Sequence, residues 1–483
     1  MKLKELLTGT DIIDSNADME LDISSVCYDS RSAGPGSLFV AIRGFKTDGH
    51  KYISSARGLG AAAAVVEEAP QGVDIPYIVV KDSRKALARI AAVYFGHPEK
   101  KAVIVGVTGT NGKTTVTNII KGVLEDQGYK CGLVGTNGNM IGDELMETER
   151  TTPESFELFR LFAQMADKGC QYIIMEVSSH SLALDRVYGI EFATAVFTNL
   201  TQDHLDFHHT MEEYAAAKAM LFDRCRSAVI NIDDSYSGVM MAGSCENKIT
   251  YSAKDPSAGL YASNIDLEIS GISFDLVHKE ETRRVRLAIP GMFSVYNALA
   301  ALGCLYELGI ELDRAIASLA KAHGVKGRAQ VVPTGTDYTV LLDYAHTPDG
   351  VSNILKAARG FAPGRVVAIF GCGGDRDKTK RPIMGELAGQ LADFCVVTSD
   401  NPRSEEPMEI IGEILPGVEK TGCPFTVIED RRAAIRYALD NAKKGDVIVL
   451  MGKGHENYQE IKGVKHHLDE YEEVMAYFKG TTK

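Results

Sequence analysis

The sequence predicts an α/β protein with three domains, and three observations support this prediction. The chain has 483 residues, more than a single hydrophobic core usually serves, since domains average about 150 residues. Short apolar runs alternate with helical segments along most of the chain, which is typical of sheets covered by helices. Polar residues gather directly after these runs. We place the domains at 1–98, 99–329 and 330–483.

The N-terminal domain is predicted to be the smallest and of α/β type. Ser37–Ile42 and Tyr77–Val80 have the composition of strands, and the alanine-rich segment Ile53–Ala64 favours a helix. We expect the domain to end at His97-Pro98, because the residue before a proline avoids helical backbone angles.

The central and C-terminal domains are predicted to contain mostly parallel sheets. Their strand candidates are almost entirely apolar, which indicates burial on both faces of a sheet. The helical segments between them supply the crossovers that parallel pairs need. We therefore expect a P-loop-type sheet in the central domain and a Rossmann-like sheet in the C-terminal domain. The strands are predicted at 102–107, 172–177, 194–198 and 228–232, and then at 340–343, 365–370, 394–398 and 447–451.

The composition indicates an acidic globular protein. Basic residues number 52 and acidic residues 65, which gives a formal net charge of −13 at pH 7. This charge argues against a nucleic-acid partner, which would require a basic face. No run approaches the roughly 18 apolar residues of a membrane helix, and Ala298–Tyr306 is better interpreted as part of a buried helix. The nine cysteines include no CxxC pair, so we expect reduced thiols and a cytoplasmic protein without a signal peptide.

Seven clusters of polar residues follow predicted strands. In open α/β sheets, ligands bind outside the carboxyl ends of the strands. We therefore expect one shared site between the central and C-terminal domains. The clusters lie at 109–115, 176–180, 199–209, 343–349, 371–377, 400–403 and 452–456.

The first cluster has the composition of a phosphate-binding loop. The segment 108–115, with the sequence TGTNGKTT, lies between a predicted strand and a predicted helix that reaches Gly128. Its glycines let backbone N–H groups turn toward phosphate oxygens, while Lys113 can reach the β- and γ-phosphates and Thr114 can hold Mg²⁺. The usual P-loop spacing requires glycine where Val107 stands. A glycine turn that only opens a helix is the structural alternative.

This loop and the later clusters, in their order along the chain, resemble the Mur ligase family, which includes folylpolyglutamate synthetases. The resemblance extends over nearly the whole chain and is strongest to members that add the third residue of the peptidoglycan stem peptide. It implies a uridine-binding N-terminal domain, a central ATP-binding domain and a C-terminal amino-acid-binding domain. By resemblance, the loop residues that bind ATP are Gly109, Thr110, Asn111, Gly112, Lys113, Thr114 and Thr115.

The resemblance also implies a site for two Mg²⁺ ions. Glu176, at the end of a predicted strand, and His204 would be ligands together with Thr114. On their own, His204 and His208 at spacing i, i+4 also fit zinc, but oxygen-rich ligands beside a triphosphate favour Mg²⁺.

Lys218 lies in a helical segment with little other charge, where an ordinary surface lysine is the structural alternative. In the resembled family, the matching lysine is carbamylated by CO₂, and the resulting anion binds metal. We therefore expect a carbamate on Lys218, which requires a depressed lysine pKa. The expected catalytic residues are Lys113, His204 and Lys218.

Three further residues match family positions that contact ATP. Asn297 and Arg328 would hold adenine and phosphate, and Asp343 would bind ribose from the C-terminal domain. Locally, Asn297 and Arg328 are equally well explained as a polar residue near a helix start and as a linker charge. If Asp343 and Lys113 contact one ATP molecule, domain closure must assemble the site.

Five residues match family positions that hold the UDP-muramyl dipeptide. The segment 151–153, Thr-Thr-Pro, also predicts a helix start with proline at the first helical position. Arg150 and Leu184 depart from the residues usual in the family. The matching residues are Ser30, Thr151, Thr152, Ser178 and Arg186.

The segment 400–403, Asp-Asn-Pro-Arg, resembles the family motif of ligases that add meso-diaminopimelate, whereas lysine-adding members lack the arginine. A guanidinium can clamp the distal carboxylate that diaminopimelate has and lysine lacks. An Asn-Pro turn after a strand is the structural alternative. The segment 371–377, GCGGDRD, fails the dinucleotide pattern GxGxxG because position 376 is arginine. By resemblance, Arg376 assists with the carboxylate and Glu456 accepts the ammonium. The residues expected at this site are Arg376, Asp400, Asn401, Pro402, Arg403, Gly452 and Glu456.

Together these matches imply an ATP-dependent amide ligase that adds meso-diaminopimelate to UDP-N-acetylmuramoyl-L-alanyl-D-glutamate through an acyl phosphate. A ligase of the same kind that uses L-lysine and a folylpolyglutamate synthetase-like ligase are the enzymatic alternatives. A non-catalytic P-loop regulator is the alternative of another class. The expected partners are these small molecules and Mg²⁺ without nucleic acid, and we expect a monomer.

Overall fold

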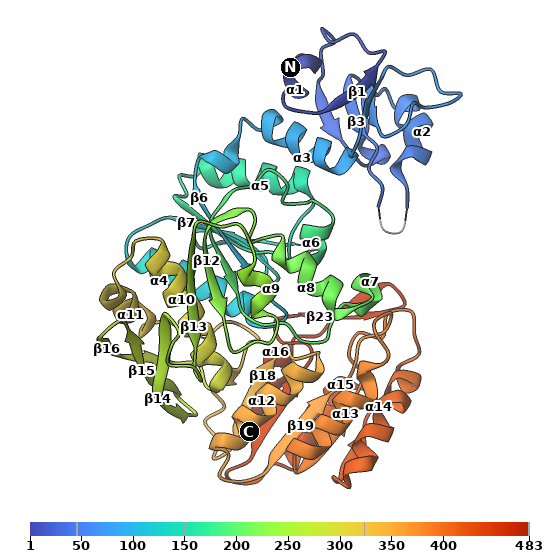
Figure 1. Ribbon diagram of the computed structural model, residues 1–483. Helices are drawn as coiled ribbons and strands as arrows, with labels where there is room; N and C mark the ends of the chain where they lie inside the picture. Colours follow the sequence, from blue (N-terminus) through green and yellow to red (C-terminus); the bar gives the residue numbers. More distant parts are fainter. Residues whose placement is uncertain (45–46, 149, 323, 482–483) are drawn as a thin grey trace. The chain divides into compact units, whose positions relative to one another are not determined.

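A computed structural model of the chain describes residues 1–44, 47–148, 150–322 and 324–481 (Figure 1). The chain divides into two compact units. The first comprises residues 1–108, 128–195 and 220–226, and the second comprises residues 109–127, 196–219 and 227–483. Helices and strands alternate in both units, so the predicted α/β class is confirmed.

The N-terminal part of the first unit contains a five-stranded sheet. Its order is β1-β5-β4-β3-β2, and all neighbours are parallel except β1 and β5. The predicted helix at 53–64 is wrong in its second half, because Gly60 has φ of 103° and the alanines that follow enter a strand. The elements are α1 (Leu3–Leu6), β1 (Ile12–Ser15), β2 (Ser25–Cys27), β3 (Ser37–Val40), α2 (Ile53–Gly58), β4 (Ala63–Val66), β5 (Tyr77–Val80) and α3 (Ser83–Tyr94).

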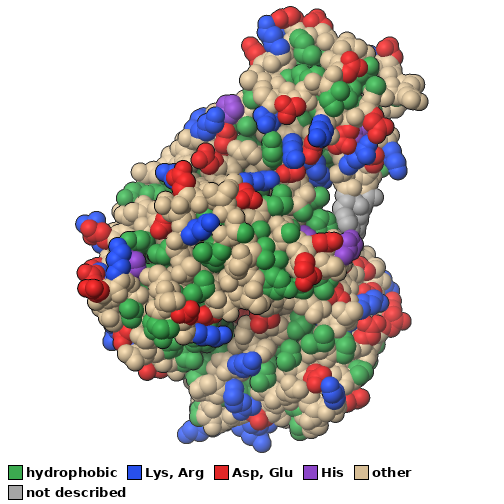
Figure 2. Space-filling model, in the orientation of Figure 1, with side chains coloured by type: hydrophobic (Ala, Val, Ile, Leu, Met, Phe, Trp, Pro, Cys, Tyr) green, Lys and Arg blue, Asp and Glu red, His purple; other side chains and the backbone are tan. Residues whose placement is uncertain are grey.

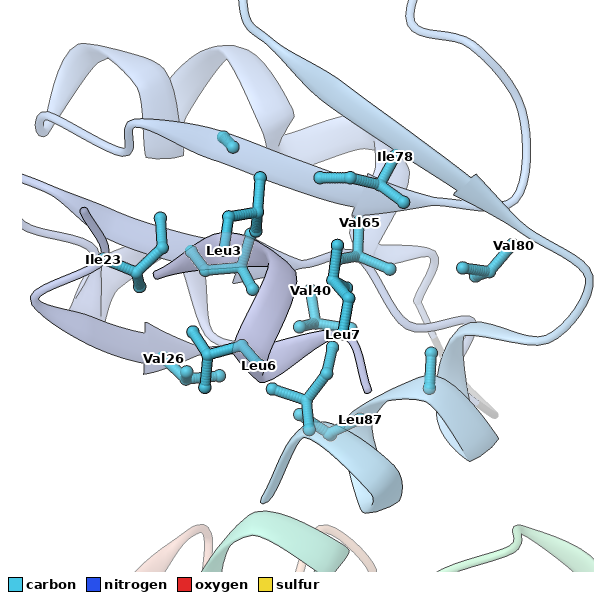
Figure 3. Packing of buried hydrophobic residues seen from close by; sticks show 14 of the residues in the cluster. Leu3, Leu6, Leu7, Ile23, Val26, Val40, Val65, Ile78, Val80 and Leu87 are labelled. Carbon is cyan, nitrogen blue, oxygen red and sulfur yellow. The ribbon is translucent and has the colours of Figure 1, made fainter. Parts of the chain in front are cut away.

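One face of this sheet packs against α1 and α3 (Figure 3). Leu3 and Leu6 of α1 meet Val65 and Ile78 of the sheet, and Leu87 joins them from α3. All five side chains are almost completely removed from water, so hydrophobic burial holds this part together.

The rest of the first unit contains three parallel strands in the order β6-β10-β7, followed by the antiparallel strands β8 and β9. The predicted helix start at 151–153 is wrong. The helix begins at Ser155, because Glu154 still has extended backbone angles. The elements are β6 (Val103–Thr108), β7 (Cys131–Val134), β8 (Asn139–Ile141), β9 (Glu144–Met146), α5 (Ser155–Asp167), β10 (Tyr172–Glu176), α6 (Ser179–Ala183) and the start of β11 (Phe192–Phe197).

The second unit begins with the phosphate-loop helix and continues through strands β12 to β16. The first three of these strands are parallel, and β14, β15 and β16 pair antiparallel. The predicted buried helix around Ala298–Tyr306 is confirmed as part of α10. The elements are α4 (Lys113–Asp126), α7 (Leu205–His208), α8 (Met211–Ala219), β12 (Cys225–Asn231), α9 (Ser237–Met241), β13 (Asn247–Ser252), β14 (Leu260–Glu268), β15 (Gly271–His278), β16 (Glu281–Leu287), α10 (Met292–Glu307) and α11 (Leu312–Leu319).

The C-terminal part of the second unit is a Rossmann-like six-stranded sheet with the order β17-β18-β22-β19-β20-β21. All neighbours are parallel except β17 and β18. Helices α15 and α16 cover one face through Ile435 and Val474, while α13 packs between α12 and α14 and contacts both. The elements are β17 (Gln330–Val332), β18 (Thr339–Asp343), α12 (Pro348–Phe361), β19 (Val366–Phe370), α13 (Lys380–Leu391), β20 (Phe394–Val397), α14 (Pro407–Thr421), β21 (Phe425–Val427), α15 (Arg431–Asp440), β22 (Val447–Met451), β23 (Tyr458–Ile461), β24 (Val464–His467) and α16 (Glu470–Thr481).

Basic and acidic side chains are intermixed on the face drawn in Figure 2. Within the described residues, no helix combines the length and the apolar composition that crossing a membrane requires.

Helices α13 and α14 approach closely at Gly417, which provides a test of the packing. A Cβ there would lie 1.9 Å from the Pro382 carbonyl oxygen, whereas a Cβ at Gly412, in the same helix, has open space around it. We expect Gly417→Ala to lower the free energy of unfolding by about 1–3 kcal/mol because it overpacks the contact. Gly412→Ala, the matched control, should raise it by about 0.5–1 kcal/mol, since alanine is the better helix residue. Denaturant unfolding of both variants measures these changes, and equal stability of the two would contradict the packing described.

Candidate active site

The predicted phosphate loop connects β6 to α4. Gly109 has φ of 147° and Gly112 has φ of 87°, angles that glycine adopts readily. A Cβ at Gly109 would lie 1.9 Å from the Thr198 hydroxyl oxygen, so a larger residue requires a rearrangement. The Thr198 hydroxyl also donates a hydrogen bond to the Asn111 carbonyl (2.6 Å), and Thr115 is buried in the first turn of α4. The loop is therefore held in a fixed shape.

Lys113 and Thr114 begin α4. The Lys113 ammonium donates hydrogen bonds to the carbonyls of Gly109 (2.8 Å) and Thr110 (2.9 Å), which folds the side chain over the loop. The Thr114 hydroxyl is almost buried and accepts a hydrogen bond from the Arg328 guanidinium (3.1 Å). The loop thus has two cationic groups beside it.

Residues from α10 and α12 approach the same loop. The side-chain oxygen of Asn297, on α10, would lie 2.5 Å from a Cβ at Gly112. The Asn111 side-chain amide donates a hydrogen bond to Asp349, in the first turn of α12 (2.8 Å). Within the second unit, the phosphate loop therefore lies beside the segment that follows the first parallel strand of the C-terminal sheet.

The carboxylate of Asp343, at the end of β18, is hydrogen-bonded to backbone amides. Its two carboxylate oxygens accept hydrogen bonds from the amides of Ala329 (2.7 Å) and Ala345 (2.8 Å). Removal from water raises the pKa of Asp343, and the nearby Arg328 opposes this shift. Arg328 itself lies over the ring of Tyr344, 4.6 Å from the centroid. Asp343 thus orders the segment before β17, and its contact with ribose remains a prediction.

Lys218, on α8, is buried rather than on the surface. Its side chain is among the largest fully buried ones. Its amine donates a hydrogen bond to the Gly109 carbonyl (2.8 Å) and lies 4.6 Å from the centroid of the Tyr214 ring. Burial, and next the charge of Lys113, place the pKa of Lys218 well below its ordinary value, against the opposing effect of Asp203. A neutral amine is therefore favoured.

Asp203 and His204 follow β11. His204 has φ of 56°, and its Nε2 lies 3.4 Å from the Asp203 carboxylate. Burial alone would raise the pKa of Asp203, but His204, His346 and Lys380 outweigh it and lower the pKa to about 2. Burial and Lys380 lower the pKa of His346 to about 4, so its imidazole is neutral at pH 7.

Within residues 1–44, 47–148, 150–322 and 324–481, no three histidine, cysteine, aspartate or glutamate side chains form a group that could hold a metal ion. The Mg²⁺ ligands expected from the sequence also include the Thr114 hydroxyl and a carbamylated Lys218, and neither belongs to these four residue types.

Glu176 lies in the first unit, at the carboxyl end of β10 and opposite Val107 of β6. Its carboxylate accepts hydrogen bonds from the amide (2.9 Å) and the hydroxyl (3.0 Å) of Thr136. That hydroxyl also lies 2.9 Å from the Thr151 hydroxyl, and the Thr152 hydroxyl donates to the Glu176 carbonyl (2.8 Å). A nearly buried carboxylate is thus connected to both threonines expected at the dipeptide site. Thr136 was missed because nothing in its local sequence distinguishes it.

Two other residues expected at the dipeptide site converge on Thr152. The Ser178 amide donates a hydrogen bond to the Thr152 hydroxyl oxygen (3.2 Å), and the Arg186 guanidinium donates one to the Thr152 carbonyl (3.1 Å). Ser30 lies elsewhere in the first unit, on the short turn Ser30–Ser32 after β2. The structure therefore brings four of the five residues together.

The segment 400–403 follows β20 and pairs with the β23–β24 hairpin. Arg403 has φ of 52°. Its amide donates to the Glu460 carbonyl (3.0 Å), and its carbonyl accepts from the Lys462 amide (2.6 Å). Its guanidinium donates to the Gly374 carbonyl (2.7 Å) and lies 3.6 Å from the Glu460 carboxylate. Both the backbone and the side chain of Arg403 are thus fixed.

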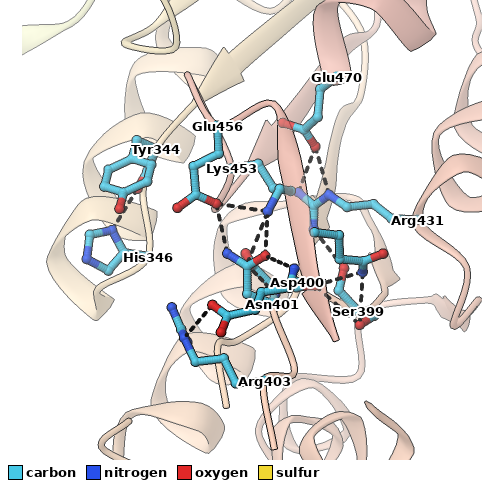
Figure 4. A network of polar contacts seen from close by, with 12 residues as sticks. Tyr344, His346, Ser399, Asp400, Asn401, Arg403, Arg431, Lys453, Glu456 and Glu470 are labelled. Carbon is cyan, nitrogen blue, oxygen red and sulfur yellow. Dashed lines mark hydrogen bonds and ion pairs between the residues drawn. The ribbon is translucent and has the colours of Figure 1, made fainter. Parts of the chain in front are cut away.

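Glu456 lies against this segment (Figure 4), and so does Gly452. A Cβ at Gly452 would lie 2.3 Å from an Asp400 carboxylate oxygen. The Asn401 side-chain amide donates a hydrogen bond to Glu456 (2.8 Å). Arg376 differs, because its side chain is exposed and, among the described residues, its guanidinium donates only to the carbonyl of the preceding residue (3.0 Å).

A buried group of charges beneath this segment was missed from the sequence. Lys453 is fully buried, as are both members of the ion pair between Arg431 and Glu470 (2.8 Å). Burial would raise the pKa of Asp400, but Lys453 and Arg431 outweigh it and keep the pKa low. The only sequence signal was a lysine between two glycines, beside the predicted Glu456.

The fold and this site define a Mur ligase. Three family models match in order along the chain: "Mur ligase family, catalytic domain" at residues 22–95, "Mur ligase middle domain" at 107–305 and "Mur ligase, glutamate ligase domain" at 327–454. Together they cover more than half of the chain, which therefore belongs to the Mur ligase family.

A relative from Caldanaerobacter subterraneus subsp. tengcongensis, named UDP-N-acetylmuramoyl-L-alanyl-D-glutamate–2,6-diaminopimelate ligase, is 51% identical over 463 residues, 95% of each chain. A solved structure of a ligase with the same name is 33% identical with a TM-score of 0.72, and the match covers 100% of this chain and 99% of that one. Mycobacterium tuberculosis folylpolyglutamate synthase, solved with ADP and AMPPCP, shares the fold at 18% identity and a TM-score of 0.65. That match covers 77% of this chain and 93% of the other.

The contact between Gly109 and Thr198 provides a test of the phosphate loop. A methyl group at position 109 overpacks the loop, and overpacking costs about 1–3 kcal/mol. We therefore expect Gly109→Ala to weaken nucleotide binding by between about fivefold and about a hundredfold. Gly122→Ala is the matched control, because Gly122 is exposed on α4 and a Cβ there meets nothing within 4 Å. Titration with a fluorescent ATP analogue measures both, and unchanged affinity in Gly109→Ala would contradict the loop's role.

Proposed function

We propose that this protein is an ATP-dependent ligase that joins meso-diaminopimelate to UDP-N-acetylmuramoyl-L-alanyl-D-glutamate in cytoplasmic peptidoglycan precursor synthesis, acting as a monomer. ADP and phosphate are the other products. One observation carries the proposal: the segment 400–403 and Glu456 form one connected network in the same unit as the phosphate loop. The 51% identity to a relative of that name supports it. The proposed domains remain 1–98, 99–329 and 330–483.

The loop 109–115 holds the triphosphate, and Asn297, Arg328 and Asp343 hold the rest of the nucleotide. Lys113 begins α4, so its ammonium and the helix N-terminus both present positive potential to phosphate oxygens. The γ-phosphoryl group moves to the D-glutamyl carboxylate, which gives an acyl phosphate and ADP. Charge on the transferred group is spread over its oxygens, and Lys113 neutralises part of it.

The proposal includes Mg²⁺ and a carbamate on Lys218. The amine of Lys218 is hydrogen-bonded to the loop at Gly109, and burial lowers its pKa well below the ordinary value; a lowered pKa favours the neutral amine that captures CO₂. The other proposed ligands are Thr114 in the first turn of α4, Glu176 at the end of β10 and His204 just before α7. When bound, the metal withdraws charge from the phosphoryl oxygens. Tyr214 keeps Lys218 in place through its ring.

The UDP-muramyl dipeptide is held by the first unit in this proposal. Thr151, Thr152, Ser178 and Arg186 bind its peptide end, and Ser30 contacts the uridine. The bonds that join Thr152 to Ser178 and Arg186 support a common site.

Diaminopimelate occupies the C-terminal network. Arg403 clamps the distal carboxylate, and Glu456 accepts a hydrogen bond from the neighbouring ammonium. Arg376 is an additional, exposed cation. Residues 400–402 and Gly452 line the space that the ligand occupies. The other amine attacks the acyl carbon and forms the carbon–nitrogen bond, the carbon–oxygen bond to phosphate breaks, phosphate leaves with the bonding electrons, and the amine gives up a proton. L-Lysine lacks the distal carboxylate, so it leaves Arg403 without that partner.

A substrate panel tests the proposed function. We expect phosphate release with the muramyl dipeptide and meso-diaminopimelate to exceed that with L-lysine by about 10⁴ in kcat/KM, because the unmatched guanidinium disfavours lysine. Arg403→Met should reduce this preference by at least about tenfold. Preferred use of L-lysine or of glutamate by the wild type would instead support the two alternative ligases.

A second test concerns Lys218. We expect Lys218→Ala to lower turnover by about 10²–10³-fold or more, because the carbamate that would hold the metal beside the phosphoryl group is lost. Lys218→Glu, or added acetate or formate, should partly restore activity by supplying a carboxylate. Lys248→Ala, an exposed lysine on β13, is the control. Full activity of Lys218→Ala would refute the role, and ¹³C NMR with ¹³CO₂ would detect the carbamate directly.

A further inference from the structure

Lys453 is a completely buried lysine beside the proposed amino-acid site, and the structure shows its hydrogen-bond partners. It follows Gly452 at the end of β22, and its side chain has no exposed surface. A buried ammonium requires hydrogen-bond partners of opposite charge or strong polarity. Those partners come from both segments that are proposed to bind diaminopimelate.

Three hydrogen bonds close a triangle around this ammonium (Figure 4). The Lys453 Nζ donates to Glu456 Oε2 (2.8 Å) and to Asn401 Oδ1 (2.9 Å). The Asn401 Nδ2 donates to the same Glu456 Oε2 (2.8 Å). Each member is thus bonded to the other two, so neither Glu456 nor Asn401 can rotate without breaking a charge-assisted bond.

The triangle leaves the second oxygen of Glu456 available. Oε2 accepts two hydrogen bonds, whereas Oε1 accepts none from the described residues. Glu456 is partly exposed, so Oε1 can accept a hydrogen bond from an ammonium outside the protein. Lys453 therefore fixes which oxygen faces the ligand.

The triangle is also connected to Arg403 through the hairpin. Asn401 Oδ1 accepts a second hydrogen bond from the amide of Glu460 (2.9 Å). The carbonyl of Glu460 in turn binds the Arg403 amide (3.0 Å). One short path thus fixes the separation between Glu456, which is proposed to bind the ammonium, and Arg403, which is proposed to bind the carboxylate.

Lys453 is held from the opposite side as well. Its Nζ lies 3.9 Å from Asp400 Oδ1. The buried Arg431 binds the carbonyl of Met451 (2.7 Å), at the end of β22, and the carbonyl of Ser399 (3.2 Å), just after β20. The two strand ends that carry the network are therefore tied to each other.

We propose that Lys453 is the positioning residue for recognition of the distal end of the diamino acid. It does not touch the substrate. It orients the carboxylate of Glu456 and the amide of Asn401 so that an ammonium and a carboxylate on one carbon fit between Glu456 and Arg403. This inference rests on the proposed function, because it assigns a role within that same site.

The test is Lys453→Met, which keeps the length of the side chain and removes the ammonium. Loss of hydrogen bonds to charged groups typically costs a factor of about 10 to 100, so the KM for meso-diaminopimelate should rise by that factor. The KM values for ATP and the muramyl dipeptide should stay within about twofold. The burst of ADP formed from ATP and the dipeptide without diaminopimelate should also remain, because that step precedes use of the site.

Two further variants keep the test decisive. Lys462→Met is the matched control, since Lys462 is exposed on the same hairpin and pairs with Glu406; all three KM values should be unchanged. Asn401→Ser breaks the triangle without removing a buried charge. If thermal melting shows that Lys453→Met does not fold, Asn401→Ser becomes the variant that tests the positioning role. It should also raise only the KM for diaminopimelate.

The outcomes separate the two proposals. If the wild type does not use meso-diaminopimelate, the proposed function is wrong. If it does, but folded Lys453→Met or Asn401→Ser keeps the wild-type KM, the positioning role is overturned. An equal rise in all three KM values would overturn it too, because it would indicate a general structural role.

Discussion

Two lysines converge on one carbonyl oxygen at the centre of the phosphate loop. Lys113 and Lys218 each donate a hydrogen bond to the Gly109 carbonyl, at 2.8 Å in both cases. Two adjacent ammonium charges repel each other, and Lys218 is the more deeply buried, so it is the lysine whose neutral form is favoured. The loop must have a fixed shape for this to occur, and Thr198 fixes it by leaving no space for a side chain at Gly109. The chemistry proposed for the site depends on this contact.

Much of the fold could be predicted because the central strands are buried on both faces. The strands at 77–80 and 447–451 have the predicted bounds, and most others differ by one to three residues at either end. Strands β15 and β16 were missed because charged residues such as Arg284 alternate with the apolar ones, which weakens the apolar signal. The helix predicted at 53–64 was wrong because alanine favours helices locally, while in this chain the second half of the segment is buried in a sheet. Tertiary burial overrode propensity there.

The site was predictable where a local sequence pattern carries the chemistry, and not where contacts between distant segments do. Gly109 and Lys113 belong to a continuous motif between a strand and a helix. Thr136, which holds Glu176, has no such motif. Lys453 stands inside a recognisable segment, but its function depends on Asn401, 52 residues away in the sequence. The roles of individual site residues remain proposals, and the structure supplies their neighbours.

The buried pair between Arg431 and Glu470 has a consequence for folding. Glu470 opens α16, whereas Arg431 binds the ends of β20 and β22. A buried charge without its partner costs about 3–5 kcal/mol. Until α16 docks, Arg431 must either stay without its partner or leave these strand ends apart. Completion of the amino-acid site is therefore coupled to the docking of a helix that contributes no proposed ligand-binding residue.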